Sequence, residues 1–300
     1  MSSTRNGENP VKRVIKDIIA YLNYEAYQTG LLKMHPHISV MSVQETINEL
    51  VNTNKSLVRF GDGEIGLIRG INLNLQNRSD ELVDRLKDIL KYSDENMIVA
   101  IQDIFDGVDM YIPRTQRFWR DHFLFCRKIY EKYCNPNRVY GSTSFSRCYI
   151  TIEDKSKCKK WFEDIKKIWN DKDVVVVEGV SGHNGVGNDL LDTSRSVERI
   201  ICPPSNAFAS YDKILEACLE YGVDRLFLLA IGAAAKPLAQ DLFRKGYRVI
   251  DIGNLDTEYE LYLRGAMEKM PIEKRSIITE EENICAGYSK YLGEITKRIV

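Results

Sequence analysis

The chain has 300 residues, and 42 Lys and Arg balance 43 Asp and Glu to give a formal net charge of −1. Without a basic surplus there is no electrostatic reason to expect a nucleic-acid partner, because binding to phosphate backbones needs positive charge. The hydrophobic fraction of 44% is ordinary for a globular protein with a sizeable core. The polar start and the short apolar runs predict neither a signal peptide nor a membrane span, and therefore a cytoplasmic protein.

The cysteines and histidines give no metal or disulfide pattern. There are seven cysteines and four histidines, and no two cysteines are spaced C-x-x-C. An odd count without paired spacing argues against a disulfide framework and against a structural zinc site. Free thiols in a reducing compartment are the better interpretation.

Two helices are predicted before the strands begin. Residues 12–32 carry Val14, Ile18, Ile19 and Leu22 at helical spacing, and a second helix is expected after Ser42, whose distance to Glu45 is that of a capping box. We interpret the first helix as an amphipathic helix packed on the protein. The less favoured alternative is peripheral membrane association through residues 11–34.

From residue 56 onward strands and helices alternate. Strands are predicted at residues 56–60, 97–101, 138–142, 173–178, 199–202, 225–231 and 247–252. Helices are predicted at residues 81–91, 117–133, 157–169, 188–194, 210–221, 233–245 and 257–267.

This alternation, with fully apolar strands, predicts an α/β fold built on a Rossmann-like, mostly parallel sheet with helices on both faces. Residues 55–270 are expected to form this core. Residues 1–54 are expected to form an N-terminal helical extension packed on it, and residues 271–300 a C-terminal tail. Ligands of such sheets bind at the carboxyl ends of the strands, so chemistry is expected directly after each strand.

The first segment of this kind holds two carboxylates two positions apart, in Gly61-Asp62-Gly63-Glu64. The glycines permit a tight turn, so that Asp62 and Glu64 can face a common point. Two oxygen ligands on a loop suit Mg²⁺ or Mn²⁺, completed by waters and substrate phosphates. The alternative is a polar turn, since Asp-Gly is a common turn dipeptide.

A glycine-rich segment, residues 178–189, follows the most apolar strand. Glycines such as Gly185 and Gly187 allow the backbone to approach a phosphate, and a helix start adds favourable amide dipoles. The alternative is a flexible connection in which Asn188 or Asp189 caps a helix.

Three later segments add polar candidates. Asn206 suits a hydrogen bond to a base or ribose, or a turn. Lys236 stands in the first turn of a helix, where a lysine is disfavoured unless an anion such as phosphate is near; the alternative is a solvated surface lysine. Three acids that suit a general base, or simply a helix start, follow the last strong strand: Asp256, Glu258 and Glu260.

Taken in order, these segments resemble the bacterial glycosyltransferases of the GT-D fold. The resemblance runs from residue 56 to residue 262. The motifs that carry it are the run Arg59 to Glu64, Phe145-Ser146-Arg147, Val177-Glu178-Gly179, Gly185-Val186-Gly187-Asn188-Asp189-Leu190, the run Arg199 to Pro203 with Asn206-Ala207, Lys236 with Leu238-Ala239 and Asp241-Leu242, and Asp251-Ile252-Gly253 with Asp256, Glu258, Tyr259 and Glu260.

The resemblance implies a UDP-sugar donor, a glycan, glycoprotein or glycolipid acceptor, and a divalent cation, Mn²⁺ or Mg²⁺, at Asp62 and Glu64. One of the three acids would act as general base, with inversion at the anomeric carbon. The implied nucleotide-sugar-binding residues are Arg59, Gly61, Gly63, Arg147, Gly185, Gly187, Asn188, Asn206 and Lys236.

Departures from the family pattern keep alternatives open. Ser181-Gly182-His183-Asn184 stands where a Ser-Arg pair is expected, and Gly232-Ala233-Ala234-Ala235-Lys236 lacks the expected threonine hydroxyl. The main alternative is therefore a non-catalytic nucleotide-sugar-binding or glycan-assembly partner protein. A dehydrogenase is disfavoured, because no acidic ribose-binding residue stands at Rossmann spacing. The segments outside the core are expected to cover the acceptor site or to form a homodimer.

Overall fold

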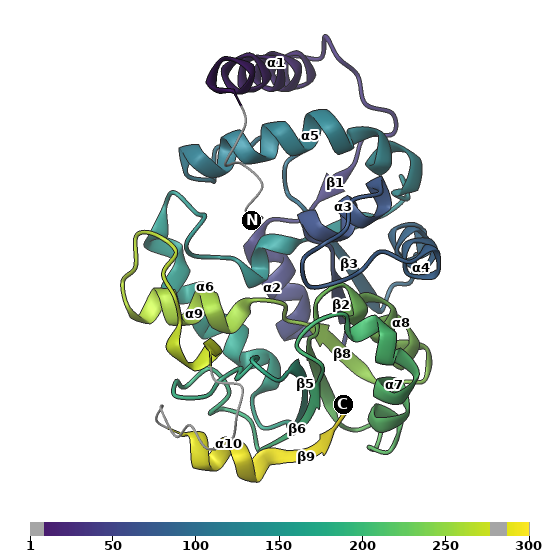
Figure 1. Cartoon of the computed structure of the whole chain (residues 1–300), viewed down its shortest axis with the longest axis vertical. Helices are drawn as coiled ribbons and strands as arrows, with labels where there is room; N and C mark the ends of the chain where they lie inside the picture. Colours follow the sequence, from purple (N-terminus) through teal and green to yellow (C-terminus); the bar gives the residue numbers. More distant parts are fainter. Residues whose placement is uncertain (1–8, 277–286, 300) are drawn as a thin grey trace.

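The computed structural model describes residues 9–276 and 287–299, and its centre is one sheet of parallel strands (Figure 1). Among the described residues the strand order is β1-β4-β3-β2-β8-β7-β5-β6-β9, and every neighbouring pair is parallel. The α/β fold predicted from the sequence is confirmed. The strands are β1 (Ser39–Val40), β2 (Ser56–Arg59), β3 (Met97–Ile101), β4 (Val139–Ser142), β5 (Asp173–Gly179), β6 (Ser196–Cys202), β7 (Leu226–Ala230), β8 (Arg248–Asp251) and β9 (Ile295–Arg298).

Helices flank this sheet. In Figure 1, α4, α7 and α8 lie on one side of it and α6 and α9 on the other, while α1 lies across α5 at one end. None of the described helices combines the length and the apolar character that a membrane span requires. The helices are α1 (Pro10–Gln28), α2 (Val43–Asn52), α3 (Asp62–Arg69), α4 (Asp80–Lys91), α5 (Pro113–Tyr133), α6 (Cys158–Lys166), α7 (Tyr211–Leu219), α8 (Ala235–Arg244), α9 (Leu255–Leu263) and α10 (Tyr288–Glu294).

Most predicted elements are found, within a few residues at their ends. The capping box at α2 is confirmed: the Ser42 hydroxyl accepts from the Glu45 amide at 3.2 Å, and the Glu45 carboxylate accepts from the Ser42 amide at 2.8 Å. The helix predicted at residues 188–194 is wrong, because that segment is a series of turns. The Asn188 side chain accepts from the Leu190 amide at 3.0 Å, a local bond that competes with helix formation.

The two outermost strands come from segments outside the expected core. β1, from the N-terminal part, pairs with β4 at one edge, and β9, from the C-terminal part, pairs with β6 at the other. Neither strand carries a recognisable signal, because a two-residue strand has no periodicity and β9 is half polar.

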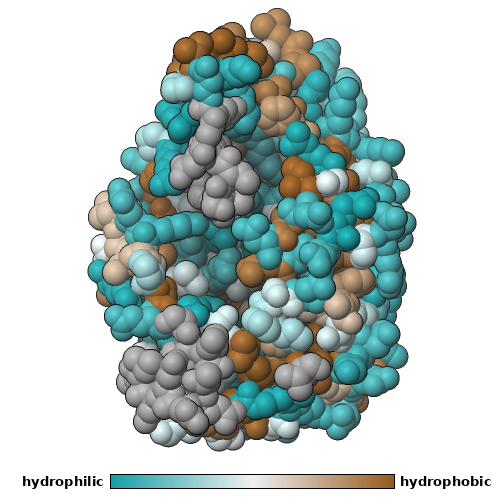
Figure 2. All heavy atoms as spheres, viewed as in Figure 1, coloured by the Kyte–Doolittle hydropathy of each residue, from teal (hydrophilic) through white to brown (hydrophobic). Residues whose placement is uncertain are grey.

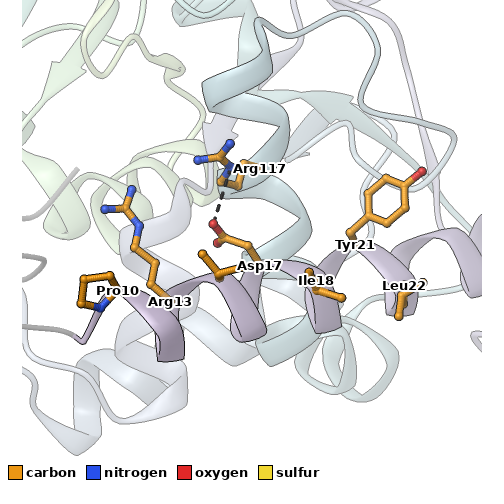
Figure 3. A pocket seen from close by; sticks show the side chains of 8 residues that line it. Pro10, Arg13, Asp17, Ile18, Tyr21, Leu22 and Arg117 are labelled. Atoms are coloured by element: carbon orange, nitrogen blue, oxygen red, sulfur yellow. Dashed lines mark ion pairs between the residues drawn. The ribbon is translucent and has the colours of Figure 1, made fainter.

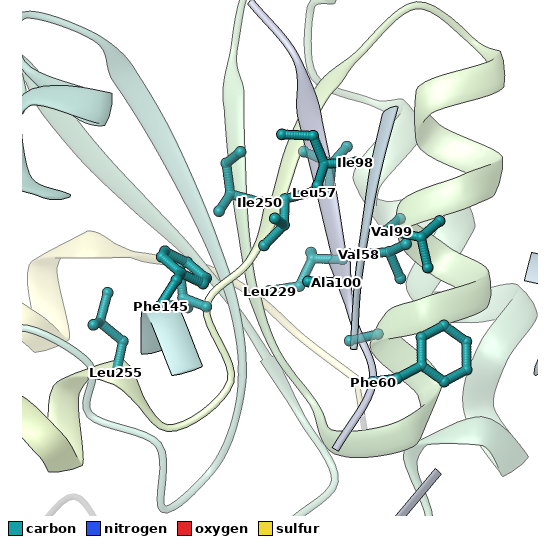
Figure 4. Packing of buried hydrophobic residues seen from close by; sticks show 14 of the residues in the cluster. Leu57, Val58, Phe60, Ile98, Val99, Ala100, Phe145, Leu229, Ile250 and Leu255 are labelled. Atoms are coloured by element: carbon teal, nitrogen blue, oxygen red, sulfur yellow. The ribbon is translucent and has the colours of Figure 1, made fainter. Parts of the chain in front are cut away.

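The hydrophobic core lies along the central strands. Figure 4 shows Leu57, Val58, Ile98, Val99 and Ile250 packed together from β2, β3 and β8. All of these side chains are buried, as are Val174 to Val177 of β5. Burial on both faces is typical of a parallel sheet covered by helices, and it makes the sheet a rigid base for the loops at its edges.

The first helix departs from the prediction. The apolar residues whose spacing predicted it, Val14, Ile18, Ile19 and Leu22, are 51–59% exposed, so the helix does not pack through the side that predicted it. The helix instead packs through Ala20 and Tyr24, which are buried against the rest of the protein, with α5 as the helix beneath. Its core-facing side is aromatic and small rather than aliphatic.

The strand order reverses between β2 and β8, which pair through Leu57 and Ile250. β3 and β4 extend the sheet beyond β2, while β7, β5 and β6 extend it beyond β8. Open α/β sheets bind ligands at the carboxyl ends of strands next to such a reversal. In the view of Figure 2 the surface is hollowed and hydrophilic near the middle, in the region that lies between α5 and α9 in Figure 1.

Candidate functional site

A buried group of three charges joins the ends of β2 and β8 to the start of α8. Lys236 Nζ lies 3.0 Å from Glu64 Oε1 and 3.0 Å from Asp251 Oδ2, and it donates to the Gly232 carbonyl at 3.1 Å. The Lys236 side chain is 1% exposed. The anions that allow a lysine in the first turn of α8 are thus two carboxylates of the protein. The structure places Lys236 inside this triad (Glu64, Lys236 and Asp251).

Glu64 is held as a carboxylate within the triad. Burial raises its pKa, but the charges of Lys236 and Arg59 and the Gly61 amide, which donates to Glu64 Oε2 at 2.7 Å, together hold the pKa below its usual value. The hydrogen bond from the Gly61 amide to Glu64 also closes the first turn of α3. Glu64 therefore links three elements of the fold.

Asp62 points to a different place. It is the first residue of α3, and residues two apart in a helix project about 200° apart around the axis. The Asp62 charge acts on His122 of α5, whose pKa is lowered to about 4 by burial while Asp62 opposes that shift. The Asp62 and Glu64 side chains therefore leave α3 on different sides, and a cation shared by the two carboxylates stays a prediction.

Asp62 is the carboxylate of the motif that is available to a divalent cation, whereas Glu64 is already paired with Lys236. The described residues contain no cluster of three or more His, Cys, Asp or Glu side chains placed to hold a metal ion. No hydrogen bond or ion pair is found for the Asp62 carboxylate among the described residues, whereas Glu64 is held by Lys236. A magnesium-like ion needs only one or two protein carboxylates when phosphates and waters complete its shell.

Arg59 lies at the carboxyl end of β2 and is almost fully buried. Its Nη1 donates to Thr143 Oγ1 at 3.2 Å, and its Nε has no hydrogen-bond partner among the described residues. The guanidinium lies against Gly253, where a Cβ atom would stand 2.2 Å from Arg59 Nη2. Gly253 also has a φ of +50°, so this position requires glycine for two reasons.

A second group of charges gathers Asp62, Arg147, Glu258 and Lys269, and we call it the charged cluster. Burial raises the pKa of Glu258 above its usual value, and nearby Arg147 and Lys269 oppose the shift without cancelling it. Burial and the Arg147 charge lower the pKa of Lys269, while Glu258 and Asp62 oppose that change. Residues from four segments distant in sequence thus act on one another electrostatically, and Lys269 was missed by the sequence analysis because it follows the last predicted helix.

The three acids of α9 have different surroundings. Glu258 is buried, and its Oε2 accepts from the amides of Ile150 at 2.9 Å and Tyr149 at 3.2 Å. Asp256 is ion-paired with Lys274 at 3.0 Å and with Arg275 at 3.0 Å, while Glu260 lies 2.9 Å from Lys274. Of the three carboxylates, only that of Glu258 forms no direct ion pair with a described residue.

The ion pairs of Asp256 keep it charged in spite of burial. Burial raises its pKa, but Lys274, Arg275 and its hydrogen bonds outweigh that effect and lower the pKa below the usual value. Lys274 also donates to the Val186 carbonyl at 2.6 Å. Lys274 and Arg275 lie in the segment expected to be a tail, and no sequence pattern pointed to them.

The glycine-rich loop (residues 178–189) is fixed from both ends. The Gly185 amide donates to Asp256 Oδ1 at 2.8 Å, and Asn188 Nδ2 donates to Asp256 at 2.9 Å and to Glu260 at 2.6 Å. Gly185 and Gly187 have φ values of +75° and +74°, which favour glycine. The Gly185 amide and the Asn188 side chain therefore bind the loop to α9.

The base of the same loop is held by Glu178, which is fully buried. It accepts from the Asn184 amide at 2.8 Å and from Arg199 Nη1 at 2.7 Å. Arg199 is also paired with Glu294 of α10 at 2.7 Å. The buried charges of this loop are thus satisfied within the protein.

Asn206 links two connecting segments of the fold through hydrogen bonds. It adopts a left-handed backbone with φ of +52°, and its Oδ1 accepts from Gln76 Nε2 at 2.8 Å and from the Asn77 amide at 3.3 Å. It joins the loop after β6 to the connection between α3 and α4. Its expected contact with a base or ribose stays a prediction.

Comparison with known proteins places these features in a family. A model described as the glycosyltransferase GT-D fold matches residues 57–280. A probable glycosyl transferase Gly of Streptococcus gordonii is 39% identical over 247 residues, which cover 82% of this chain and 36% of that protein. The glycosyltransferase GlyD of Streptococcus pneumoniae serotype 4 is 38% identical over 82% of this chain and 30% of its own length. The chain thus spans about a third of the length of these relatives.

Solved structures agree over nearly the whole chain. One, described as a highly conserved domain of unknown function 1792 with a distinct glycosyltransferase fold, has a TM-score of 0.84 and 35% identity, covering 94% of this chain and 100% of its own. Another, described as a new glycosyltransferase from Streptococcus sanguinis, has a TM-score of 0.81 and 37% identity, covering 88% and 100%.

Proposed function

Because the chain belongs to the family of glycosyltransferases with the GT-D fold, we propose that it transfers a sugar from a UDP-sugar to a hydroxyl group of a glycan or glycoconjugate. The observation that carries this proposal is the charged cluster of Asp62, Arg147, Glu258 and Lys269. It combines one carboxylate that has no ion partner among the described residues, two cations and one carboxyl group of raised pKa. These are the groups needed to bind a diphosphate and to accept a proton.

The diphosphate of the donor is assigned to Arg147 and Lys269. Both are cations beside Glu258, and Arg147 offers a planar fork of donors that matches phosphate oxygens. Burial and repulsion from Arg147 lower the pKa of Lys269. A bound anion would oppose both effects, because a nearby negative charge stabilises the charged ammonium. Arg59, whose Nε has no hydrogen-bond partner among the described residues, contributes a further positive charge from the end of β2.

Asp62 is the residue that would hold a divalent cation, and when bound the cation would neutralise charge on the departing UDP. Glu64 is assigned a supporting role instead, since its carboxylate fixes the start of α3 through Gly61 and Lys236. Held in this way, α3 presents Asp62 in one orientation. The cation assignment therefore rests on one carboxylate of the predicted pair.

Glu258 is the general base for the acceptor hydroxyl in this proposal. A raised pKa makes a carboxylate a stronger proton acceptor near neutral pH. Two backbone amides fix Oε2, and no hydrogen bond is found for Oε1 among the described residues. Deprotonation of the hydroxyl by Glu258 leads to direct displacement of UDP and to inversion at the anomeric carbon.

A binding protein without catalysis is the second candidate. It is favoured by the internal use of Gly185 and Asn188, whose polar groups bind Asp256 instead of facing a ligand. Such a protein would bind a nucleotide-sugar through the same cations but would not turn it over. It would also be indifferent to replacement of Glu258.

One experiment separates the two candidates. UDP-, GDP- and TDP-sugars are first screened for thermal stabilisation of the chain, since a ligand that binds only the folded state raises its apparent stability. Donor hydrolysis with Mn²⁺ is then measured for the wild type, Asp62→Asn and Glu258→Gln. Turnover by the wild type that both variants lose supports the transferase. Stabilisation without turnover by any donor would overturn it in favour of the binding protein.

A further inference from the structure

One face of α1 is covered with exposed aliphatic and aromatic side chains. They are 48–65% exposed, and Figure 2 shows hydrophobic atoms over this helix at the top of the molecule. At about 100° per residue they fall within an arc of about 160° and extend for about 18 Å along the axis. We call this set the apolar stripe: Val11, Val14, Ile15, Ile18, Ile19, Tyr21 and Leu22.

The stripe is not needed to attach α1 to the protein. The opposite side of the helix does this: the Tyr24 hydroxyl donates to the Ile104 carbonyl at 2.7 Å, and Tyr27 lies 4.6 Å from the Phe123 ring, centroid to centroid. Lys16 is paired with Asp121 at 3.1 Å. The Arg120 guanidinium carbon lies 5.1 Å from the centre of the Tyr21 ring, while the aliphatic members of the stripe are all more than half exposed. A contiguous exposed apolar surface of this kind is typical of a site of interaction.

A groove runs beside the stripe, between α1 and α5. Its volume is about 640 Å³, and Figure 3 shows Arg13, Asp17 and Tyr21 along it with Arg117 on the far side. Arg117 Nε lies 3.7 Å from Asp17 Oδ2. Ile18 and Leu22 belong to both the groove and the stripe. A ridge next to a groove can pack against a second copy of itself.

Charge favours an antiparallel partner. Lys12 lies in the first turn of α1, where the helix dipole disfavours a cation, and Glu25 lies near its end on the same side as the stripe. If a second α1 crosses this one with Ile18 opposite Ile18, residue 25 of one copy meets residue 11 of the other. Glu25 then stands beside Lys12 and the positive end of the other helix dipole, which is favourable for both charges.

We propose that the apolar stripe forms a symmetric homodimer, in which α1 packs antiparallel against α1 of a second copy with Ile18 at the two-fold axis. A two-fold interface uses the same patch on both copies, and the spacing of Val11, Val14, Ile18 and Leu22 suits helix-on-helix packing. The carboxyl-end site of the sheet takes no part in it. The dimer is therefore separable from sugar transfer.

Sedimentation velocity of the 300-residue chain tests the proposal. The wild type is expected to be a dimer, and Ile18→Glu is expected to be a monomer at the same concentration with an unchanged circular dichroism spectrum and unchanged donor turnover. Val223→Glu, at an equally exposed valine outside α1, is the matched control and should stay dimeric. A wild-type chain that is monomeric at every concentration overturns the proposal, whether or not it sediments with phosphatidylserine-containing vesicles.

A cross-link tests the register. Ile18→Cys is expected to give a covalent dimer under mild oxidation, because a residue at the two-fold axis meets its own copy. Val223→Cys and the wild type should give none; the six described cysteines are buried, and the comparison with the wild type accounts for Cys285. Charge reversal in Glu25→Lys should weaken the dimer, and adding Lys12→Glu should restore it. Failure of both the cross-link and the restoration overturns the antiparallel arrangement.

Discussion

Lys236 Nζ lies 3.0 Å from Glu64 Oε1, so a carboxylate that its motif assigns to a metal is instead the partner of a buried ammonium. The lysine was expected to bind phosphate, and the glutamate was expected to bind a cation. Both expectations rested on single charges that lacked a visible partner in the sequence. The fold supplies the partner, because β2 and β8 are neighbours and α8 begins beside their ends.

The first prediction concerns the stability of this triad. Lys236→Met leaves the buried carboxylates of Glu64 and Asp251 without their cation, and loss of one partner from a buried ion pair costs about 3–5 kcal/mol. We expect the free energy of unfolding, measured by urea titration, to fall by about that amount. Lys245→Met, at an exposed lysine of the same segment, should change it by less than about 0.5 kcal/mol. Equal stability of the two variants would contradict a structural role.

The second prediction separates the two acids of the Asp-x-Glu motif. Asp62→Asn removes the ligand assigned to the cation, and we expect it to reduce turnover and the apparent affinity for Mn²⁺ while leaving the melting temperature unchanged. Glu64→Gln removes a buried charge and should lower the melting temperature at every concentration of Mn²⁺. Titration of activity against Mn²⁺, with thermal melts of the same samples, compares them. If Glu64→Gln is as stable as the wild type, the division of roles is wrong.

Most of the fold could be predicted from the sequence for a simple physical reason. Buried parallel strands such as residues 174–177 are continuous apolar runs, and helices such as α4 repeat apolar residues every three or four positions. These patterns come from local burial and can be seen without coordinates. The two-residue strand β1 and the half-polar strand β9 carry no such pattern, and each is ordered by a neighbour distant in sequence.

The site was less predictable, because charge pairing is a property of the assembled fold. The locations of Asp62, Glu258 and Arg147 at the carboxyl edge follow from strand order, but Lys269, Lys274 and Arg275 have no pattern in the sequence. The orientation of α1 could not be predicted either. Its periodicity identified the helix and its apolar side, but it did not show that this side faces outward. The contacts of Tyr24 and Tyr27 and the ion pair of Lys16 with Asp121 decide that orientation.

The third prediction concerns the pH dependence of transfer. A general base must be deprotonated, and burial raises the pKa of Glu258, so activity should fall with decreasing pH at a higher pH than for an ordinary exposed carboxylate. We expect Glu258→Gln to lower kcat by about 10²–10⁴-fold, the usual contribution of a general base. Glu260→Gln should still show the fall of kcat/KM at low pH. If Glu258→Gln shows the same fall of kcat/KM at low pH as the wild type, another group accepts the proton.

The fourth prediction uses the opposite shift at Asp256. Its pKa is lowered in the folded state, because Lys274 and Arg275 outweigh burial. A group of this kind adds stability above its unfolded pKa, and that stability is lost as the pH falls through the folded value. Lys274→Met removes one of the two cations that sustain the shift, so its deficit in unfolding free energy should be full at pH 7 and should shrink below about pH 4, where the carboxylate of the unfolded chain is protonated.

Urea titrations of the wild type and Lys274→Met between pH 3 and pH 8 measure this difference directly. Lys290→Met is a suitable control, because the Lys290 ammonium is exposed and its closest carboxylate oxygen is 3.8 Å away. Exposed pairs contribute little, so this variant should follow the wild-type curve at every pH. Because Asp256 binds Gly185 and Asn188, Lys274→Met should also loosen the glycine-rich loop at pH 7, seen as faster amide hydrogen exchange in residues 183–188. A pH-independent deficit with unchanged exchange would mean that Lys274 acts through packing and not through the charge of Asp256.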